Sequence, residues 1–183
     1  RLAGAGGFIN ISQNAKKVLF VGTFSTGDLD LRIEDGRPKI VNEGTCAKFV
    51  QAVEHRTFSG AEARRRGQRV LYITERCVFQ LATDGEHQRL ELIEIAPGID
   101  LERDILARMD FVPLISPQLK LMEAALFTDE PIGLRERLLA TPLAQRFELD
   151  AEHHRLFINF EGLVIDAASD ITDIENVLSA LLA

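Results

Sequence analysis

Three glycines within four residues, close to the start of the chain, restrict its fold more than any other stretch. Residues 4–7 read Gly-Ala-Gly-Gly, and Phe8, Ile9 and Ile11 follow at once. Because glycine has no Cβ atom, a ligand can approach the backbone amides of such a segment closely. The apolar residues that follow would anchor the segment to a core. We therefore expect a ligand-binding glycine loop that leads into a buried strand at residues 14–22.

Charge and cysteine content exclude several classes of partner. The chain of 183 residues has 21 Lys and Arg against 28 Asp and Glu, a formal charge of −7, so we expect no nucleic-acid partner. No apolar run approaches the roughly 18 residues of a membrane-spanning helix, so we expect no membrane partner. Cys46 and Cys77 lack metal-ligand spacing and favour a reducing compartment. These features predict a cytoplasmic protein without a metal site.

Hydrophobic patterning predicts several strands. Two alternating segments flank the acidic-glycine turn at 34–38, which indicates a hairpin. A turn at 83–86 joins two further apolar runs in the same way. Those two runs are residues 78–81 and 90–95. Further strands are predicted at residues 48–53 and 70–74, and residues 156–165 are predicted to form a strand pair or a bulged strand.

Capping residues and apolar stripes predict the helices. Ser59 and Glu62 have capping-box spacing, which predicts a short helix at 60–66. Asp100 is a candidate N-cap for a helix at 101–109. Two further helices are predicted at 132–139 and 171–182.

Other candidate functional residues do not have the sequence context that a metal site or a nucleotide-binding loop requires. His153 and His154 are adjacent, so on a strand they would point to opposite faces and could not bind one metal together. The glycine segment precedes a predicted strand instead of following one, which does not fit the nucleotide-binding patterns. The amides of residues 4–7 remain candidates for holding an oxyanion in a thioester reaction, since preorganised N–H donors stabilise developing negative charge. The alternative is a flexible glycine-rich leader.

Three stretches, in order along the chain, resemble the family I coenzyme A transferases. The first is the glycine segment with the strand after it, residues 4–24. The second, residues 70–79, resembles the family's strand with Thr-Glu and Val-Phe. The third, residues 90–105, contains Glu-Ile-Ala-Pro-Gly-Ile-Asp. The chain resembles most the C-terminal half of the single-chain acyl-CoA:acetate/3-ketoacid and propionate type, and residues 159–163 look like the extension of larger members.

The resemblance implies a fold and a domain organisation. The implied fold is α/β, with an open, mainly parallel sheet, flanking helices and added β-hairpins. Residues 1–127 would form an N-terminally truncated C-terminal domain, and residues 128–183 an extension packed on the same domain. Because the sequence begins at Arg1 and not at Met, we expect it to be a piece of a longer polypeptide.

The resemblance also implies a reaction and a site. Members of the family move coenzyme A between carboxylates, through an acyl-glutamyl anhydride and a glutamyl-CoA thioester. Gly7 would supply an oxyanion-hole amide, Gly4 and Gly6 would shape the loop, and Asn10 would lie at the coenzyme A site. Coenzyme A thioesters would be substrates, with no permanently bound cofactor.

The family's nucleophilic glutamate lies in a Ser-Glu-Asn-Gly-like motif upstream of the glycine segment, and this chain contains no such motif. Glu43 and Glu161 each precede a glycine but lack the flanking pattern. We therefore expect the chain to be inactive alone, to need the missing N-terminal portion, and to act in a homo-oligomer on a short-chain acyl-CoA and a carboxylate. An acyl-CoA hydrolase on the same scaffold and a non-catalytic partner-binding or assembly module are the alternatives.

Overall fold

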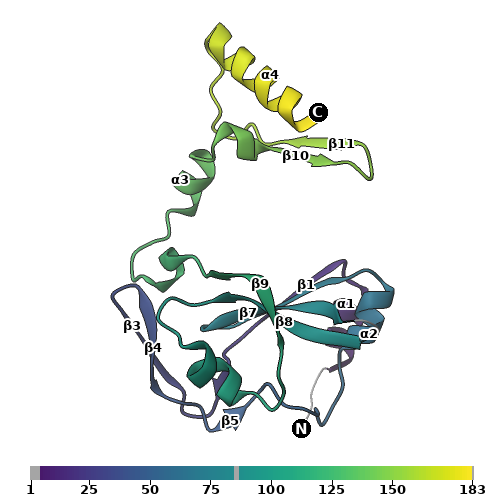
Figure 1. The fold of residues 1–183 in the computed structure, drawn as a ribbon, viewed down its shortest axis with the longest axis vertical. Coiled ribbons are helices and arrows are strands. Elements are labelled where there is room, and N and C mark those ends of the chain that lie inside the picture. Colours follow the sequence, from purple (N-terminus) through teal and green to yellow (C-terminus); the bar gives the residue numbers. More distant parts are fainter. Residues whose placement is uncertain (1–4, 85–86, 183) are drawn as a thin grey trace. The chain divides into compact units, whose positions relative to one another are not determined.

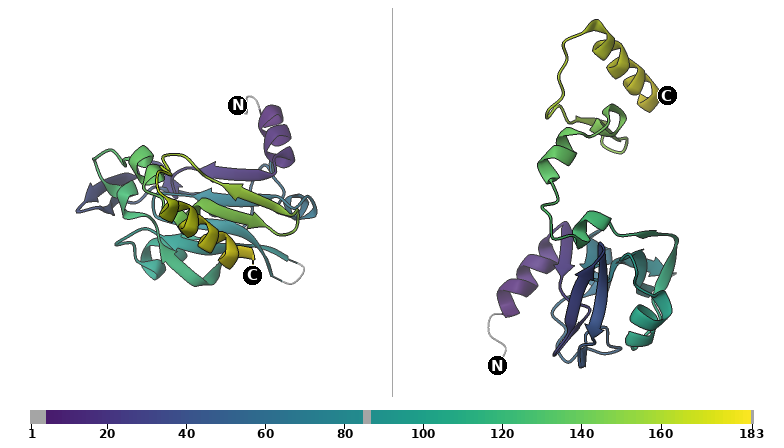
Figure 2. Two further views of the ribbon diagram at one scale, coloured as in Figure 1. Left: turned by 90° about the horizontal axis from the view of Figure 1, so that it is seen from above. Right: turned by 90° about the vertical axis from the view of Figure 1, so that its left-hand side faces the viewer.

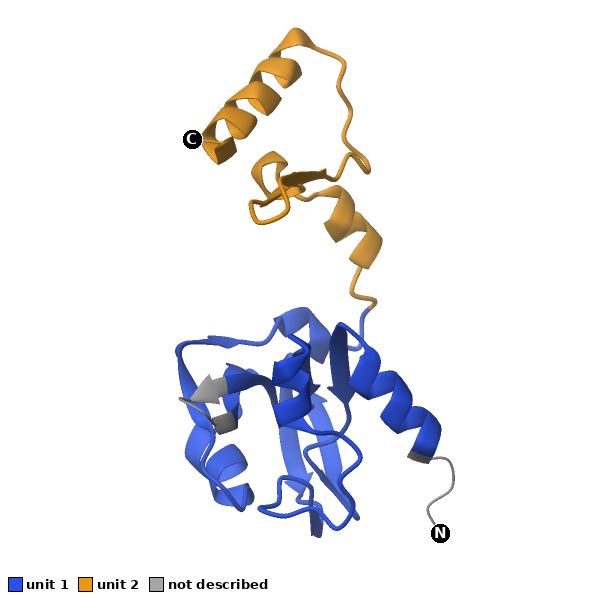
Figure 3. Ribbon diagram, turned by 90° about the vertical axis from the view of Figure 1, so that its right-hand side faces the viewer, with its two compact units in different colours: residues 1–130 blue, residues 131–183 orange. Residues whose placement is uncertain are grey.

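The computed structural model describes residues 5–84 and 87–182, without the side chains at 5, 83–84 and 87–88. Gly4 and the tip of the turn predicted at 83–86 therefore lie outside the described residues. The chain divides into two compact units, Arg1–Glu130 and Pro131–Ala183 (Figure 3). Packing of the extension on the first domain stays a prediction.

An open five-stranded sheet forms the centre of the first unit (Figure 1). Its strands lie in the order β1-β6-β7-β8-β9, so they follow the order of the chain from one edge of the sheet to the other. β1 pairs with β6, and β8 with β9, in parallel, whereas β7 is antiparallel to both of its neighbours. The expected α/β sheet with flanking helices and added hairpins is confirmed. The strands are β1 (Lys17–Val21), β6 (Arg69–Ile73), β7 (Cys77–Asp84), β8 (His87–Ile95) and β9 (Leu114–Leu121).

Two small pairs of strands lie outside the central sheet. β3 (Asp30–Glu34) and β4 (Arg37–Asn42) form the predicted hairpin, and Asp35 and Gly36 both have positive φ at its turn. That backbone conformation is the one a tight hairpin turn requires. β2 (Ser25–Thr26) pairs with β5 (Cys46–Ala47).

The prediction of a strand at residues 48–53 is wrong, because this segment forms no strand. Instead, the ring of Phe49 packs between Phe24 and Phe79, with centroid separations of 4.6 and 5.1 Å. The apolar residues of the segment therefore serve side-chain packing against the sheet and not backbone pairing.

The prediction of a glycine loop is also wrong for residues 5–7, since these residues belong to α1 (Ala5–Asn14). Glycine destabilises a helix interior, but the residues that follow support the helix. The hydroxyl of Ser12 donates to the carbonyl of Phe8, and Asn14 donates to that of Asn10. The strand consequently starts at Lys17, later than expected.

Strand β1 is buried on one face only. Val18 is buried, whereas Leu19 and Val21 are 53% and 77% exposed. A continuous apolar run had indicated burial on both faces. Among the described residues, nothing covers the second face of β1, and its side chains are exposed.

Capping determines where the next two helical segments begin. α2 (Gly60–Arg65) starts at Ser59, whose hydroxyl accepts a hydrogen bond from the amide of Glu62, as predicted. Asp100 likewise accepts from the amide of Arg103. The helix expected at 101–109 is a π-helical turn, η1 (Leu101–Ile105), followed by a 3₁₀ turn, η2 (Leu106–Arg108).

One face of the sheet carries the main core. Phe20, Tyr72, Phe79 and Leu92 lie opposite one another on successive strands, and opposite residues share a face. The fully buried members of the main cluster are Phe24, Cys77, Phe79, Leu92 and Ile105. A smaller cluster of Val18, Ala63 and Val70 extends it. A third cluster, around Val78, Ala96, Met122 and Phe127, includes the turn η3 (Ala124–Phe127).

The second unit is a hairpin with helices. β10 (Phe147–Asp150) and β11 (Arg155–Ile158) pair antiparallel, so β11 finds its partner upstream and not within 156–165. The buried Arg146 donates to four backbone carbonyls, of Leu139, Thr141, Asn159 and Glu161. The predicted terminal helix is present as α4 (Ala168–Leu182), which contacts β10 (Figure 2). α3 (Leu134–Leu139) and the turn η4 (Leu143–Arg146) complete the unit.

The cap of α2 gives a first prediction. Ser59→Ala removes the acceptor for the Glu62 amide, and we expect the free energy of unfolding to fall by about 1 kcal/mol. Urea denaturation followed by circular dichroism measures this change. Ser59→Thr keeps a capping hydroxyl and serves as the control. Equal losses in the two variants would show that the hydroxyl does not stabilise the helix.

Candidate functional site

The glycines that the sequence singled out lie in the first described turn of α1. A Cβ atom built on Gly6 or Gly7 would meet no heavy atom of the described residues within 4 Å. The first four amides of a helix have no acceptor within the helix, and the helix dipole adds partial positive charge there. The amide of Gly7 therefore suits an anionic oxygen. Its role, and that of Gly6, stay predictions.

Asn10 lies one turn further along α1. Its side-chain oxygen accepts a hydrogen bond of 2.9 Å from Asn14. This contact holds the amide along the helix surface. A contact of Asn10 with coenzyme A stays a prediction, and Gly4 lies outside the described residues.

An aromatic groove of about 1000 Å³ begins directly after the glycines, because Phe8 lines it. The ring of Phe20 lies 6.0 Å from Phe8, 5.0 Å from Tyr72 and 5.2 Å from Phe58, between ring centroids. The groove thus joins residues from α1, β1 and β6 on one face of the sheet. Sequence reasoning missed it, since nothing local indicates that these rings meet.

A fully buried arginine sits at the turn between β6 and β7. The two terminal nitrogens of Arg76 donate to the two carboxylate oxygens of Glu43, both at 2.9 Å. Its Nε donates to Glu75 at 3.0 Å, and one terminal nitrogen also reaches the carbonyl of Asp104. The guanidinium carbon lies 4.5 Å from the centre of the Phe24 ring. A buried charge is tolerated when it is paired and hydrogen-bonded in this way.

Glu43 belongs to this network and not to a nucleophile motif. Besides Arg76, it accepts hydrogen bonds from the hydroxyl of Ser25 and the amide of Gly44. The Arg76 hydrogen bonds lower the pKa of Glu43 to about 2, against the opposing effect of burial. The sequence signal for this network was a charged pair, Glu75 and Arg76, between two apolar strands. Glu43 could not be matched to that pair from sequence.

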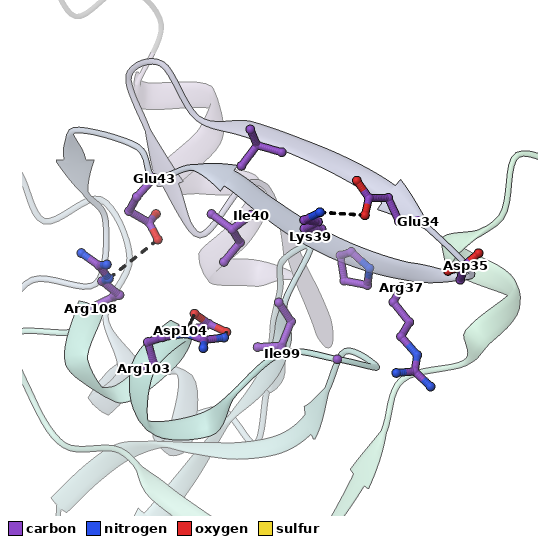
Figure 4. Close-up of a pocket in the computed structure, with 13 residues that line it drawn as sticks. Glu34, Asp35, Arg37, Lys39, Ile40, Glu43, Ile99, Arg103, Asp104 and Arg108 are labelled. Atoms are coloured by element: carbon purple, nitrogen blue, oxygen red, sulfur yellow. Dashed lines mark hydrogen bonds and ion pairs between the residues drawn. The ribbon is translucent and has the colours of Figure 1, made fainter.

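A second hollow, of about 790 Å³, lies between β4 and the η1–η2 segment (Figure 4). Its rims carry ion pairs: Lys39 to Glu34 at 2.8 Å, Arg103 to Asp104 at 2.8 Å, and Arg108 to Glu43 at 3.8 Å. The four cations among its described lining residues are matched by four anions. They are Arg37, Lys39, Arg103 and Arg108 against Glu34, Asp35, Glu43 and Asp104. This charged cleft contains none of the residues predicted for the site.

The remaining candidate groups do not converge. Burial raises the pKa of the Cys77 thiol to about 12, which disfavours the thiolate, and Cys46 is exposed. His153 lies 2.9 Å from a carboxylate oxygen of Asp150. Within the described ranges, no three His, Cys, Asp or Glu side chains are placed to hold a metal ion. No helix in those ranges is long and apolar enough to cross a membrane.

The depressed pKa of Glu43 predicts a pH dependence. A carboxyl group whose pKa is about 2 when folded and about 4.5 when unfolded stabilises the fold above pH 4.5, and this contribution is lost as the pH falls towards 2. We expect up to about 3 kcal/mol of unfolding free energy to be lost over that window. Urea denaturation at a series of pH values measures it.

Glu43→Gln should remove much of this pH dependence and destabilise the chain at pH 7 by roughly 3 kcal/mol, because Arg76 loses a charged partner. Glu34→Gln is the matched control, since its pair with Lys39 is exposed and contributes about 1 kcal/mol or less. If Glu43→Gln behaved like Glu34→Gln, the network would not have the strength that its geometry indicates.

No model of a known protein family matches the chain. Curated relatives do match. The chain is 52% identical over 133 residues to acetate CoA-transferase YdiF of Escherichia coli (strain K12). This match covers 73% of the chain and 24% of that protein. It is 48% identical over 134 residues to caffeate CoA-transferase of Acetobacterium woodii, and this match covers 73% of the chain and 25% of that protein. The chain thus spans about a quarter of the length of the curated relatives it matches.

Solved structures agree with these relatives. The crystal structure of the acyl-CoA transferase YdiF from E. coli O157:H7, a thioester complex with CoA, matches with a TM-score of 0.66 at 53% identity, over 71% of this chain and 25% of that one. The apoenzyme of YdiF matches with a TM-score of 0.68 at 52% identity, over 73% of this chain and 25% of that one. With the ordered motifs and the α/β sheet, these matches show that the chain belongs to the coenzyme A transferases.

Proposed function

We propose that this chain acts within an enzyme that moves coenzyme A from a short-chain acyl-CoA to a carboxylate acceptor. The observation that carries the proposal is the 52% identity over 133 residues with a protein named acetate CoA-transferase. Acetate, propionate or a 3-ketoacid would be the acceptor or acyl group, in short-chain fatty acid or ketone body metabolism. The thioester is a substrate, and no permanent cofactor takes part. We further propose a homo-oligomer in the cytoplasm.

The proposed reaction proceeds in balanced steps. A glutamate carboxylate attacks the thioester carbonyl, coenzyme A leaves as the thiolate, and an acyl-glutamyl anhydride remains. The thiolate then attacks the glutamyl carbonyl, which releases the acyl group as a carboxylate and leaves a glutamyl-CoA thioester. The acceptor carboxylate repeats the two steps in reverse and leaves as the new acyl-CoA. Each addition places negative charge on a carbonyl oxygen.

The amide of Gly7 would stabilise that oxygen. It lies in the first turn of α1, where amides lack acceptors within the helix, and no side chain of Gly6 or Gly7 blocks an approach. Gly4 and Gly6 would keep the backbone accessible. Asn10, one turn along the same helix, would face the coenzyme.

The nucleophile is proposed to lie outside these residues, so the chain alone would be inactive. Glu43 precedes Gly44, but Arg76 binds both of its oxygens and lowers its pKa to about 2. A carboxylate so strongly stabilised is a poor nucleophile. Glu161 precedes Gly162 without the flanking motif. The N-terminal portion of the longer polypeptide would therefore complete the site.

The role of Gly7 can be tested by removing its N–H group. In the full-length enzyme, Gly7→Pro deletes the amide hydrogen at a helix turn that tolerates proline, and we expect kcat for CoA transfer to fall by about 100-fold or more. Gly7→Ala keeps the amide, and its Cβ meets open space, so this variant should retain most activity. Equal activity of the two variants would contradict an oxyanion role.

The location of the nucleophile can be tested by mass spectrometry. After exposure to an acyl-CoA, the full-length enzyme should carry coenzyme A on a glutamate upstream of Arg1. An adduct within residues 1–183 would contradict the proposal. Assays with and without acetate separate a transferase from a hydrolase, because a hydrolase would consume acyl-CoA at the same rate without an acceptor.

A further inference from the structure

The last turn of α1 lies against the segment that contains α2 (Figure 1). The last carbonyls of a helix have no donor within the helix. Here the side-chain nitrogen of Gln68 donates to the carbonyl of Ser12 at 2.9 Å and also to that of Ala15. A terminal nitrogen of Arg66 donates to the carbonyl of Gln13 at 2.9 Å. Two residues that directly follow α2 therefore satisfy three carbonyls at the end of α1.

The side chain of Gln13 completes this contact. Its oxygen accepts a hydrogen bond from the amide of Ser59 at 2.9 Å, and its nitrogen donates to the side-chain oxygen of Gln68 at 3.2 Å. Arg66 also donates to the side-chain oxygen of Asn14. The positive charge of Arg66 lies beside the helix end that carries partial negative charge, which favours the same arrangement. We call Gln13, Arg66 and Gln68 together the anchor of α1.

The other end of α1 makes fewer contacts. Among the described residues, the hydrogen bonds that join α1 to other elements all lie at residues 12–15. Nearer the start of the helix, Phe8 is 46% exposed, and its ring centroid lies 6.0 Å from that of Phe20. Ile11 is 74% exposed. The anchor therefore determines the direction of the helix axis.

This arrangement makes the position of Gly7 sensitive to the anchor. Gly7 precedes the anchored end by about 12 Å, at roughly 1.5 Å of rise per residue. A tilt of the helix by about 10° at the anchor would move the amide of Gly7 by about 2 Å. An oxyanion donor must lie within hydrogen-bond distance of the reacting oxygen, so a displacement of that size would break its contact.

We propose that Gln68 is a positioning residue for CoA transfer, because it anchors α1 and thereby fixes the place of the Gly7 amide. Its side-chain nitrogen donates to two carbonyls, so a carboxylate in its place would repel both. The proposal rests on the proposed function, in which Gly7 is the oxyanion donor.

Steady-state kinetics of the full-length enzyme test this role. With Gln68→Glu, kcat for CoA transfer should fall about tenfold because the amide is displaced, whereas KM should change by less than about twofold. Gln118→Glu makes the same chemical change at an exposed position on β9 and should leave kcat unchanged. Gln68→Lys keeps a donor for the two carbonyls and should retain more of the rate than Gln68→Glu. An unchanged kcat in Gln68→Glu would overturn the proposal.

A double variant separates positioning from a general loss of stability. Gly7→Pro lacks the amide hydrogen, so in that background Gln68 has no donor to position. The enzyme with both Gly7→Pro and Gln68→Glu should therefore be as fast as Gly7→Pro alone, within about twofold. A further loss of about tenfold would show that Gln68 does not act through Gly7, and would overturn the proposal. If circular dichroism shows that Gln68→Glu is unfolded, Gln68→Ala replaces it in both backgrounds.

NMR of the isotope-labelled 183-residue chain measures the positioning without any reaction. Gln68→Glu should shift the amide signals of Gly6 and Gly7, and Gln118→Glu should not. Unchanged glycine signals in Gln68→Glu would overturn the proposal. If these signals shift but the full-length wild-type enzyme transfers no coenzyme A, the proposed function fails and the anchoring of α1 by Gln68 stands.

Discussion

The buried guanidinium of Arg76 is the interaction on which the rest of the first unit depends. A charge without solvent is costly, and here two carboxylates, a carbonyl and an aromatic ring compensate for it. These partners come from four separate parts of the chain. The network therefore fixes the loops around the end of the sheet with a specificity that apolar contacts alone do not provide. Removing one partner leaves the others with an uncompensated charge.

The network also supports the aromatic groove, through a chain of rings. Phe24 lies against Arg76 and packs on Phe49, which packs on Phe79 in the sheet. Phe49 anchors one end of the segment that runs past the groove. The other end is held where the amide of Ser59 donates to Gln13 of α1 at 2.9 Å. The segment between them forms no strand, so its shape depends on these two anchors. One end of the groove is thus fixed by charge, and the other by polar contacts to the helix that carries the glycines.

Sequence alone predicted the local features well. The acidic-glycine turn at 34–38, the Ser59 cap and the terminal helix all follow from short-range chemistry, and the structure has them. Three ordered motifs were enough to recognise the family. The glycine segment was mistaken for a loop, because glycine propensity does not reveal that Ser12 and Asn14 support a helix after it. The Arg76 network and the groove were missed for another reason: Glu43 and Arg76, or Phe8 and Tyr72, meet only through the tertiary fold.

The central proposal is that the amide of Gly7, in the first described turn of α1, serves the transfer of coenzyme A. Chemical-shift mapping by NMR, on the isotope-labelled 183-residue chain with acetyl-CoA, tests this most directly. The account predicts that the amides of Gly6 and Gly7 shift and that the charged cleft near Arg103 and Arg108 does not respond. Shifts confined to that cleft, or no shift at Gly6 and Gly7, would contradict it.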